Sequence, residues 1–335
     1  MTREIGKKRA TIWEVARLAG VSHQTVSRYL KNDSGMRATT RTKIGQAIDE
    51  LGYRPNLAAR SMRTKRSNRI AVVLPELANF GPIPILHGAS SIARAAGYMT
   101  DVIGIEGDEH HRTESAVALL ESGQVDGILS FAPLSPEFTE STRKPIVVLD
   151  EYDDDMRSHG ELANGDPAEE IIRHLAELGH RRFLHVSGSQ DWTSARNRRA
   201  VYLEAIAKLG LESYGVVDGD WSVRSGYEAA RDLPEDSGVT AVLAANDFVA
   251  MGVIRGFQDR GVRVPDEVSV FGWDNEQFTR YFMPTISTVD LDRDTLGRQA
   301  MLSLLALLGE EQPPSGPVAG RFKIVPRESS GPAPR

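Results

Sequence analysis

The stretch from Thr11 to Arg28, TIWEVARLAGVSHQTVSR, limits the possible folds of this chain more than any other. Thr11 and Glu14 have the spacing of a capping box, which predicts that a helix begins after Thr11. Apolar residues then recur at helical spacing and share one face: Ile12, Val15, Ala16 and Ala19. Gly20 supplies a turn, and Ser22 is a favourable N-cap for a second helix. We therefore expect two short helices joined by a tight turn.

The second helix has two chemically different faces. Val26, Tyr29 and Leu30 form the apolar face, and the side chains opposite can all form hydrogen bonds. These polar residues are His23, Gln24, Ser27, Arg28 and Lys31. Such a helix suits the DNA major groove, where glutamine pairs with adenine, arginine pairs with guanine, and the N-terminal residues meet the base edges. We expect base contacts from His23, Gln24 and Arg28; the alternative is a helical hairpin with a solvated face.

The distribution of charge supports a separate nucleic-acid-binding module. Residues 1–66 contain 15 basic and 5 acidic side chains, leaving 25 basic and 41 acidic for the rest of the chain. The overall charge of −6 therefore conceals a basic N-terminal part joined to an acidic body. The basic part provides salt-dependent affinity for phosphates, and the acidic body repels DNA.

Composition excludes several other classes of protein. The chain has no cysteine, so it has neither a disulfide framework nor a thiolate zinc site. It shows no apolar run of membrane-spanning length and no hydrophobic signal core, which predicts a cytoplasmic protein without a membrane partner. No nucleophile–base or phosphate-binding motif is present, so we expect neither an enzyme nor a cofactor. Residues 109–111, Glu-His-His, are expected to form a solvated loop rather than a metal site.

The pattern changes after Arg69. Short β-branched runs alternate with helical stretches in two series, separated near residues 160–165. This alternation predicts parallel sheets covered by helices. The fold class we expect is α/β: an all-α helix-turn-helix domain followed by two doubly wound parallel-sheet subdomains.

Aspartate and tryptophan residues gather where the predicted strands end. Ligands bind beyond the carboxyl ends of strands in open α/β sheets. The residues at these ends are Asp150, Asp191-Trp192, Asp220-Trp221, Asn246-Asp247 and Trp273-Asp274. Carboxylates accept hydrogen bonds from hydroxyls and indoles pack on the apolar face of a pyranose, so the set suggests a sugar. Each aspartate has the alternative of a helix N-cap; we expect Asp247 to be structural and Trp13 to lie in a core.

The order of residue types in the basic N-terminal part, which we call the head, shows a family resemblance. Val21–Arg28, VSHQTVSR, together with Tyr53-Arg54-Pro55-Asn56 downstream, closely resembles the start of the LacI–GalR family of bacterial transcriptional regulators. The resemblance implies a homodimeric repressor that binds palindromic double-stranded operator DNA. It places phosphate contacts at Thr11, Ser22, Thr25 and Asn56. It also implies a hinge helix that includes Ala59 and Met62, where methionine replaces the usual leucine as a minor-groove wedge.

The resemblance also implies a periplasmic-binding-protein-like core with a small-molecule effector. The domains are then 1–55 for DNA binding, 56–68 for the hinge and 69–335 for the core. The first subdomain covers about 69–161 and 293–321, and the second covers about 162–292 and 322–330. The matching effector positions are Asp150, Arg196, Trp221, Asn246 and Asp274, with Phe80 on the opposite wall. We expect a β-galactoside, a β-glucoside or a short oligosaccharide; a purine, known elsewhere in the family, is less favoured beside so many carboxylates.

Overall fold

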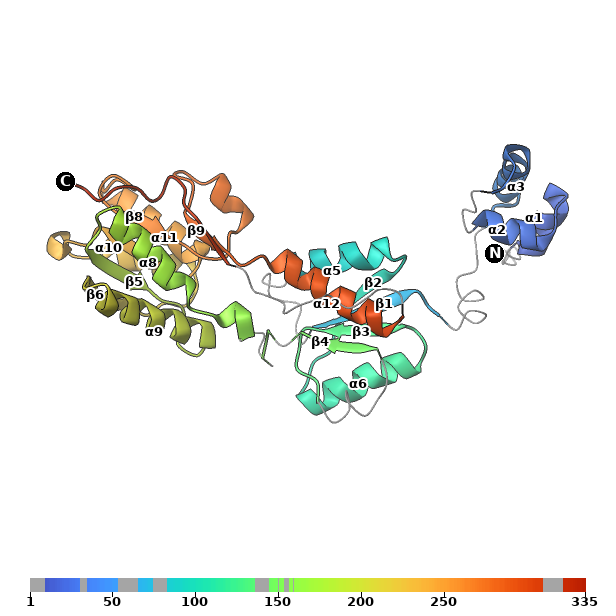
Figure 1. The fold of residues 1–335 in the computed structure, drawn as a ribbon, viewed down its shortest axis with the longest axis horizontal. Coiled ribbons are helices and arrows are strands. Elements are labelled where there is room, and N and C mark those ends of the chain that lie inside the picture. Colours follow the sequence, from blue (N-terminus) through green and yellow to red (C-terminus); the bar gives the residue numbers. More distant parts are fainter. Residues whose placement is uncertain are drawn as a thin grey trace, which may run out of the picture. The chain divides into compact units, whose positions relative to one another are not determined.

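The computed structural model describes residues 10–30, 35–53, 66–74, 83–135, 145–149, 151–153, 157–158, 160–309 and 322–335. The chain divides into two compact units, Met1–Ser67 and Asn68–Arg335 (Figure 1). Five of the predicted site residues lie outside the described residues: Asn56, Ala59, Met62, Phe80 and Asp150.

The first unit contains three helices around a small apolar core: α1 (Ile12–Ala19), α2 (His23–Leu30) and α3 (Ala38–Leu51). The capping box is confirmed, because the Thr11 N–H donates to the Glu14 carboxylate over 2.6 Å and the Glu14 N–H donates to Thr11 Oγ1 over 3.3 Å. Gly20 ends α1 with φ of 66°. Buried side chains from all three helices form the core: Val15, Ala16, Ala19, Val26, Ile44 and Ala47.

The prediction that Trp13 belongs to a core was wrong. Its side chain is 64% exposed. Trp13 is one residue past Ile12 and therefore outside the apolar stripe of α1, which is why the core leaves it in solvent.

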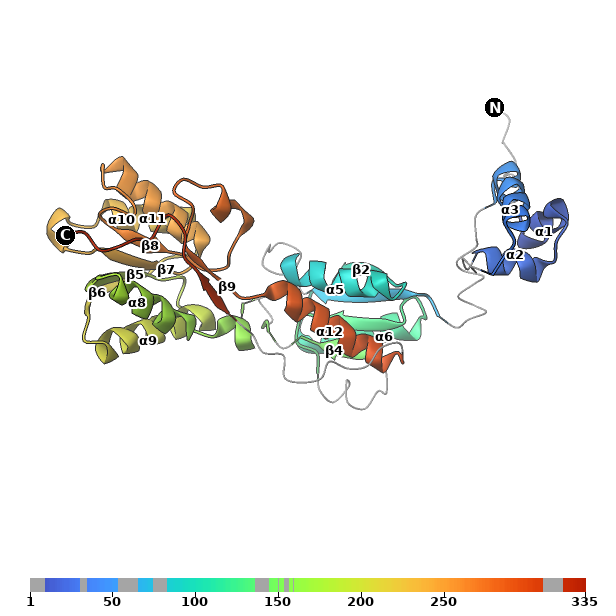
Figure 2. The ribbon, with the colours of Figure 1, turned by 45° about the horizontal axis from the view of Figure 1, so that its top comes forward.

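The second unit begins with a four-stranded parallel sheet in the order β2-β1-β3-β4. Its strands are β1 (Arg69–Leu74), β2 (Met99–Gly104), β3 (Gly127–Ser130) and β4 (Ile146–Val148). Helices α5 (Ile83–Ala95) and α12 (Arg293–Leu307) pack on one face and α6 (Glu109–Glu121) on the other (Figures 1 and 2). Alternate residues of β1 face the two layers, so Ile70 and Val72 join one core while Ala71 and Val73 join the other.

A second parallel sheet repeats this design in the order β6-β5-β7-β8. Its strands are β5 (Arg182–Val186), β6 (Glu212–Val217), β7 (Ala241–Ala244) and β8 (Ser269–Phe271). One face is covered by α8 (Pro167–Glu177) and α9 (Thr193–Lys208), and the other by α10 (Val223–Arg231) and α11 (Asp247–Asp259). The predicted class, two doubly wound parallel sheets behind a helical head, is confirmed.

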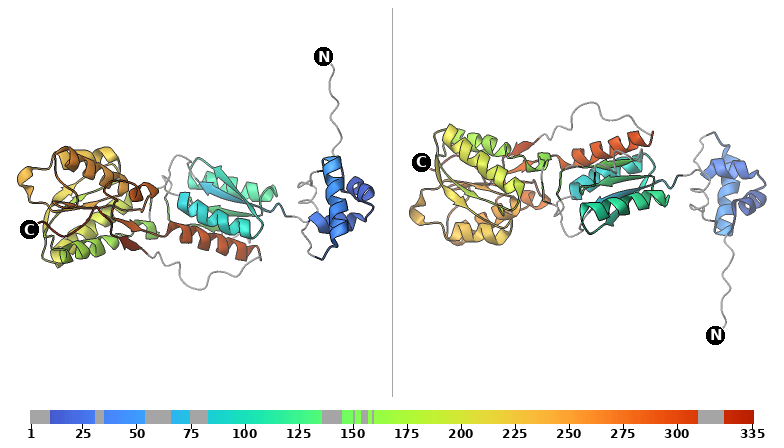
Figure 3. Two further views of the ribbon diagram at one scale, coloured as in Figure 1. Left: turned by 90° about the horizontal axis from the view of Figure 1, so that it is seen from above. Right: turned by 90° about the horizontal axis from the view of Figure 1, so that it is seen from below.

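Two late segments of the chain complete these layers. Helix α12 packs beside α5 on the first sheet, although the two are far apart in sequence (Figure 3). Strand β9 (Thr288–Asp290) pairs antiparallel with β10 (Lys323–Val325). The chain then continues past β8, where the Val270 N–H donates to the Ser329 carbonyl over 2.8 Å. Short 3₁₀ turns occur at Gly160–Ala163, Glu235–Ser237 and Gln277–Arg280.

Residues 109–111 form the first turn of α6, not the predicted loop. The Asp108 side chain caps this helix by accepting the His111 N–H over 2.9 Å. One turn on, Glu114 lies 3.4 Å from the His110 ring in an exposed pair. Within the described residues no group of three or more His, Cys, Asp or Glu side chains is placed to hold a metal ion. None of the helices described there is long and apolar enough to cross a membrane.

Candidate functional site

The DNA-reading surface predicted for the head lies at the start of α2. Ser22 holds this end in place, because its hydroxyl accepts the Thr25 N–H over 3.2 Å and lies 2.9 Å from the Thr25 hydroxyl. Val26 is fully buried and fixes the opposite face. Gln24 and Arg28 are exposed one helical turn apart, so both point away from the core. The structure thus brings the predicted base-reading and phosphate-contacting residues of α2 onto one accessible end.

Trp13 adds to this surface a contact that the sequence prediction missed. Its ring centroid lies 4.1 Å from that of His23, with the two planes inclined by 34°. The indole of α1 therefore covers the imidazole at the first position of α2. The position of Trp13 outside the apolar stripe of α1 was the available signal in the sequence.

The second cluster lies at the carboxyl ends of the strands in the second sheet and is built around a buried arginine. Arg198, on α9, is 4% exposed. Its guanidinium carbon lies 4.2 Å from the ring centroid of Trp273 and 5.6 Å from that of Trp221. One guanidinium nitrogen donates to the Ala245 carbonyl at the end of β7. Burial lowers the pKa of Arg198 to about 10, which still leaves the side chain cationic at neutral pH.

Arg196, the arginine predicted for this site, is not part of the cluster. Its side chain is exposed and donates to the Gln190 carbonyl over 2.7 Å and to the Thr193 hydroxyl over 2.9 Å. Two residues along an α-helix point in nearly opposite directions, at roughly 200°. The helix therefore directs Arg198 toward the cluster, whereas the family resemblance had indicated Arg196.

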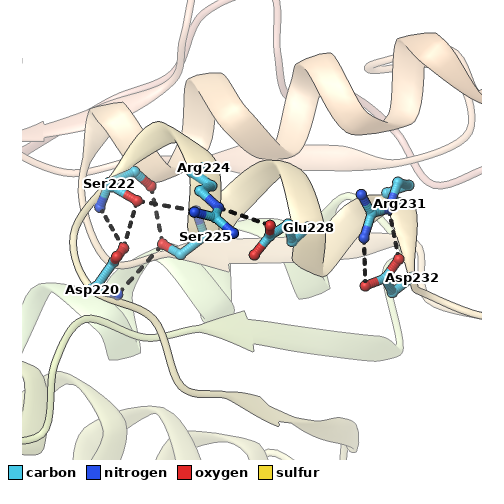
Figure 4. Close-up of polar contacts among 7 residues, drawn as sticks. All are labelled: Asp220, Ser222, Arg224, Ser225, Glu228, Arg231 and Asp232. Carbon is cyan, nitrogen blue, oxygen red and sulfur yellow. Dashed lines mark hydrogen bonds and ion pairs between the residues drawn. The ribbon is translucent and has the colours of Figure 1, made fainter.

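The indole of Trp221 is held in place from several sides. Its backbone has φ of 68°, a conformation that side chains other than glycine rarely adopt. The residues on either side maintain it, because Asp220 Oδ1 accepts the Ser222 N–H over 3.1 Å and the Ser222 hydroxyl over 2.5 Å (Figure 4). These hydrogen bonds lower the pKa of the Asp220 carboxyl. Gly188 lies against the indole, so that a Cβ there would overlap it.

Trp192 is a further aromatic residue of the cluster, and its ring centroid lies 5.4 Å from that of Trp221 in an edge-to-face arrangement. It is half-buried and stands directly before α9 as the N-cap residue. Two exposed ion pairs lie along helix α10 and at its end: Arg224 pairs with Glu228, and Arg231 pairs with the C-cap residue Asp232 (Figure 4).

Asp274, another predicted residue, is strained and paired. It has φ of 107° and is followed by Asn275 with φ of 52°. Strain of this kind persists only where the surroundings enforce it, and it concentrates at functional sites. Asp274 Oδ1 accepts a hydrogen bond of 2.5 Å from Arg293, and Asn275 Oδ1 accepts one of 2.5 Å from Arg327. Both arginines therefore hold the loop after β8.

Asn246 serves the fold as well as the predicted site. It caps α11 by accepting the Val249 N–H over 2.8 Å, and its amide nitrogen lies 3.3 Å from the Trp221 carbonyl. Asp247 is fully buried and accepts the Thr288 hydroxyl over 2.6 Å and the Glu276 N–H over 2.8 Å. These contacts fit the structural role expected of Asp247. Burial, and then the nearby Asp274 charge, raise its pKa to about 8.

The chain has a helix-turn-helix unit followed by two parallel sheets with their covering helices, which we call the first and second lobes. A polar and aromatic cluster lies at the strand ends of the second lobe. This combination defines the class of ligand-controlled DNA-binding regulators. Residues 11–56 match the model of the bacterial regulatory proteins of the lacI family, and residues 172–330 match a periplasmic binding protein-like domain. The catabolite control protein A of Priestia megaterium is 30% identical, covering 96% of this chain and 99% of that protein. The chain belongs to the LacI family and is a DNA-binding transcriptional repressor with a ligand-binding core.

Other comparisons agree with this assignment. The lactose operon repressor of Escherichia coli K12 is 30% identical, covering 90% of this chain and 85% of that protein. The crystal structure of the Lac repressor dimer bound to operator and the anti-inducer ONPF is 27% identical over 96% of this chain and 99% of that one, with a TM-score of 0.68. A complex of the transcriptional regulator CelR with cellobiose is 26% identical over 96% of this chain and all of that one, with a TM-score of 0.57.

Proposed function

We propose that a small sugar, a β-galactoside, a β-glucoside or a short oligosaccharide, controls this repressor by binding at the carboxyl ends of the second sheet. The observation that carries the proposal is the Trp221 indole, held in a strained conformation beside Arg198. An aromatic face packs on the apolar face of a pyranose, and the neighbouring guanidinium and carboxylate hydrogen-bond its hydroxyls. Asn246 and Asp274 belong to this proposed site, and Phe80 and Asp150 remain predicted members.

Similar proteins support a sugar as the effector class. The CelR structure is a complex with cellobiose, and a Lac repressor structure that is 27% identical to this chain contains ONPG. The competing class is a purine, which also has a flat face for an indole. Relatives named PurR are 28–29% identical to this chain over 88–90% of its length.

The proposed DNA-bound form is a homodimer on a palindromic operator. Each head places His23, Gln24 and Arg28 at base edges, while Thr11, Ser22 and Thr25 contact phosphates. Two copies match the twofold symmetry of such a site.

Effector and DNA are coupled through the core in this proposal. The subdomains, expected at about 69–161 with 293–321 and at about 162–292 with 322–330, change their relative angle when the sugar binds. The sugar must bind one arrangement better than the other, and couplings of about 1–3 kcal/mol change the affinity for DNA by about 5- to 150-fold. Because its partner is operator DNA, we place its action in the cytoplasm.

A thermal-shift screen of the full chain tests the effector class, using neutral and acidic sugars alongside adenine, guanine and hypoxanthine. A true effector raises the melting temperature with concentration, because binding stabilises the folded state by RT ln(1 + [L]/Kd). Any sugar that does so must also change the affinity for a genomic operator fragment in a gel shift. Stabilisation by a purine base and by none of the sugars would overturn the proposal.

A further inference from the structure

The hydrogen-bond acceptors of the proposed effector site are largely engaged within the protein. Asn246 Oδ1 accepts the Val249 N–H, and both oxygens of the neighbouring structural residue Asp247 accept hydrogen bonds from residues of the same lobe. Asp274 Oδ1 accepts a hydrogen bond from Arg293. These side chains therefore have reduced capacity to accept from the hydroxyls of a ligand.

Several hydrogen-bond donors of the same cluster, by contrast, are not engaged within the protein. Among the described residues, four buried N–H groups here have no hydrogen-bond partner: Arg198 Nε, Arg293 Nε, Trp221 Nε1 and Trp273 Nε1. A buried donor without a partner destabilises the folded state, and proteins rarely retain one without a functional reason. Four of them around one site indicate that the missing partner supplies acceptors.

These donors belong to one connected group of side chains. The Arg198 guanidinium lies against the rings of both tryptophans, and Arg293 is bonded to Asp274, the residue that follows Trp273. The Asp274 charge raises the pKa of Arg198 and the Arg293 charge lowers it, so both groups interact electrostatically with Arg198. Helices α9, α10 and α11 also begin at this edge of the sheet, which adds positive potential.

One buried carboxyl group near these cations carries little negative charge to balance them. Burial raises the pKa of Asp247 to about 8, so Asp247 is largely uncharged at neutral pH. Burial also raises the pKa of Glu276, which lies 3.9 Å from Arg293.

We propose that the effector is an acidic sugar, in which a carboxylate or phosphate group attached to the polyol accepts hydrogen bonds from Arg198 and Arg293. This inference rests on the proposed sugar site and narrows its ligand class. A neutral hydroxyl brings a donor with every acceptor, and that donor needs a partner of its own. An anionic group only accepts, and its hydrogen bonds to guanidinium are among the strongest in proteins.

Matched pairs of ligands test the proposal on the full chain by isothermal titration calorimetry at neutral pH. The pairs are lactose with lactobionate, cellobiose with cellobionate, galactose with galacturonate, and glucose with glucose 6-phosphate. The acidic member of at least one pair is expected to bind about tenfold more tightly, and its affinity alone is expected to fall as salt increases. The last pair distinguishes a phosphate from a carboxylate as the anionic group.

Substitutions on α12 test whether Arg293 is responsible for the preference for the acidic ligand. Arg293→Met is expected to remove the tenfold advantage of the acid, whereas Arg293→Lys should keep part of it because the charge remains. Arg298→Met is the matched control, since Arg298 is on the same helix, is 40% exposed and pairs with Asp294. If Arg293→Met fails to fold, the ligand pairs on the unmodified chain still decide the proposal.

The outcomes separate this inference from the broader proposal. Binding of a neutral sugar at least as tightly as its acid would overturn the acidic effector and leave the sugar site standing. Binding of neither member of any pair, together with stabilisation by a purine base, would overturn both. An acid preference that survives in Arg293→Met would also contradict the role given to Arg293.

Discussion

Trp13 and His23 form an aromatic pair across the helix-turn-helix, with ring centroids 4.1 Å apart. One ring comes from α1 and the other from the first residue of α2, so the contact joins the supporting helix to the predicted base-reading end. A side chain already held by a neighbour loses less rotamer freedom when it docks on DNA. We therefore expect Trp13 to position His23 for operator recognition.

Replacement of Trp13 by alanine should weaken operator binding without unfolding the head. Aromatic pairs contribute about 0.5–1.5 kcal/mol, so the loss should be about two- to tenfold. Fluorescence anisotropy with a labelled operator measures it, and Trp13→Phe is the control that keeps a ring over His23. Equal affinity of Trp13→Ala and the unmodified chain would show that the pair has no part in recognition.

Gln24→Ala should change which bases are preferred rather than weaken every sequence equally. Gln24 is exposed at the start of α2, and a glutamine paired with adenine discriminates by about 1–3 kcal/mol. Selection from a randomised operator library reads out base preference at each position. The comparison variant is Asn56→Ala, expected to remove a phosphate contact and reduce binding evenly; a uniform loss for Gln24→Ala would refute its role in base reading.

Arg198 and Arg196 offer a paired test of the effector site. Arg198→Met should reduce effector affinity by tenfold or more, since a hydrogen bond to a charged group contributes about 1.5–3 kcal/mol. Arg196→Met should have little effect, because that side chain is exposed and bonded to its own loop. Titration calorimetry of both variants decides between them. A larger loss for Arg196→Met would favour the position indicated by the family resemblance.

Gly188→Ala should displace the Trp221 indole, because a Cβ at Gly188 would overlap its six-membered ring. We expect the loss of effector response, with the DNA-binding head unaffected and the operator still bound. Gly215→Ala is the control, since a Cβ at Gly215 meets nothing within 4 Å. An unchanged effector response in Gly188→Ala would mean that the position of this indole does not matter.

Asp247→Asn should alter how stability depends on pH. The carboxyl pKa is raised from 3.8 to about 8, mainly by burial. Between these values the folded protein holds one proton more than the unfolded chain. The free energy of unfolding therefore falls as pH rises, by up to about 1.4 kcal/mol per pH unit from this one group.

The difference between Asp247→Asn and the unmodified chain isolates that contribution. Denaturant unfolding from about pH 4 to 9 should show the variant gaining stability relative to the parent as pH rises. Subtraction cancels other groups, such as His185, whose pKa is lowered to about 4 by burial. Asp236→Asn, at an exposed position, is the control. A constant difference across this range would contradict the raised pKa of Asp247.

Local signals in the sequence predicted most of the secondary structure. Thr11 and Glu14 located the start of α1, and Gly20 located its end, because caps depend on residues within one turn. The alternation of β and α patterns predicted the two doubly wound sheets, because hydrophobic periodicity is also a short-range signal. The start of α6 was placed too late, because a Glu-His-His segment was interpreted by its polarity rather than by the capping residue Asp108 before it.

The sequence by itself determined the class of this protein: its basic reading head, its two parallel-sheet lobes and its family. These follow from short-range spacing, charge and the order of residue types. Only the tertiary structure decided which side chains meet at the sites. It directed Arg198 rather than Arg196 inward, placed Trp13 on His23, and bonded Arg293 to Asp274. Such pairings depend on how each helix is rotated about its axis relative to its neighbours. Tertiary packing determines that rotation, and the spacing of residues along the sequence does not.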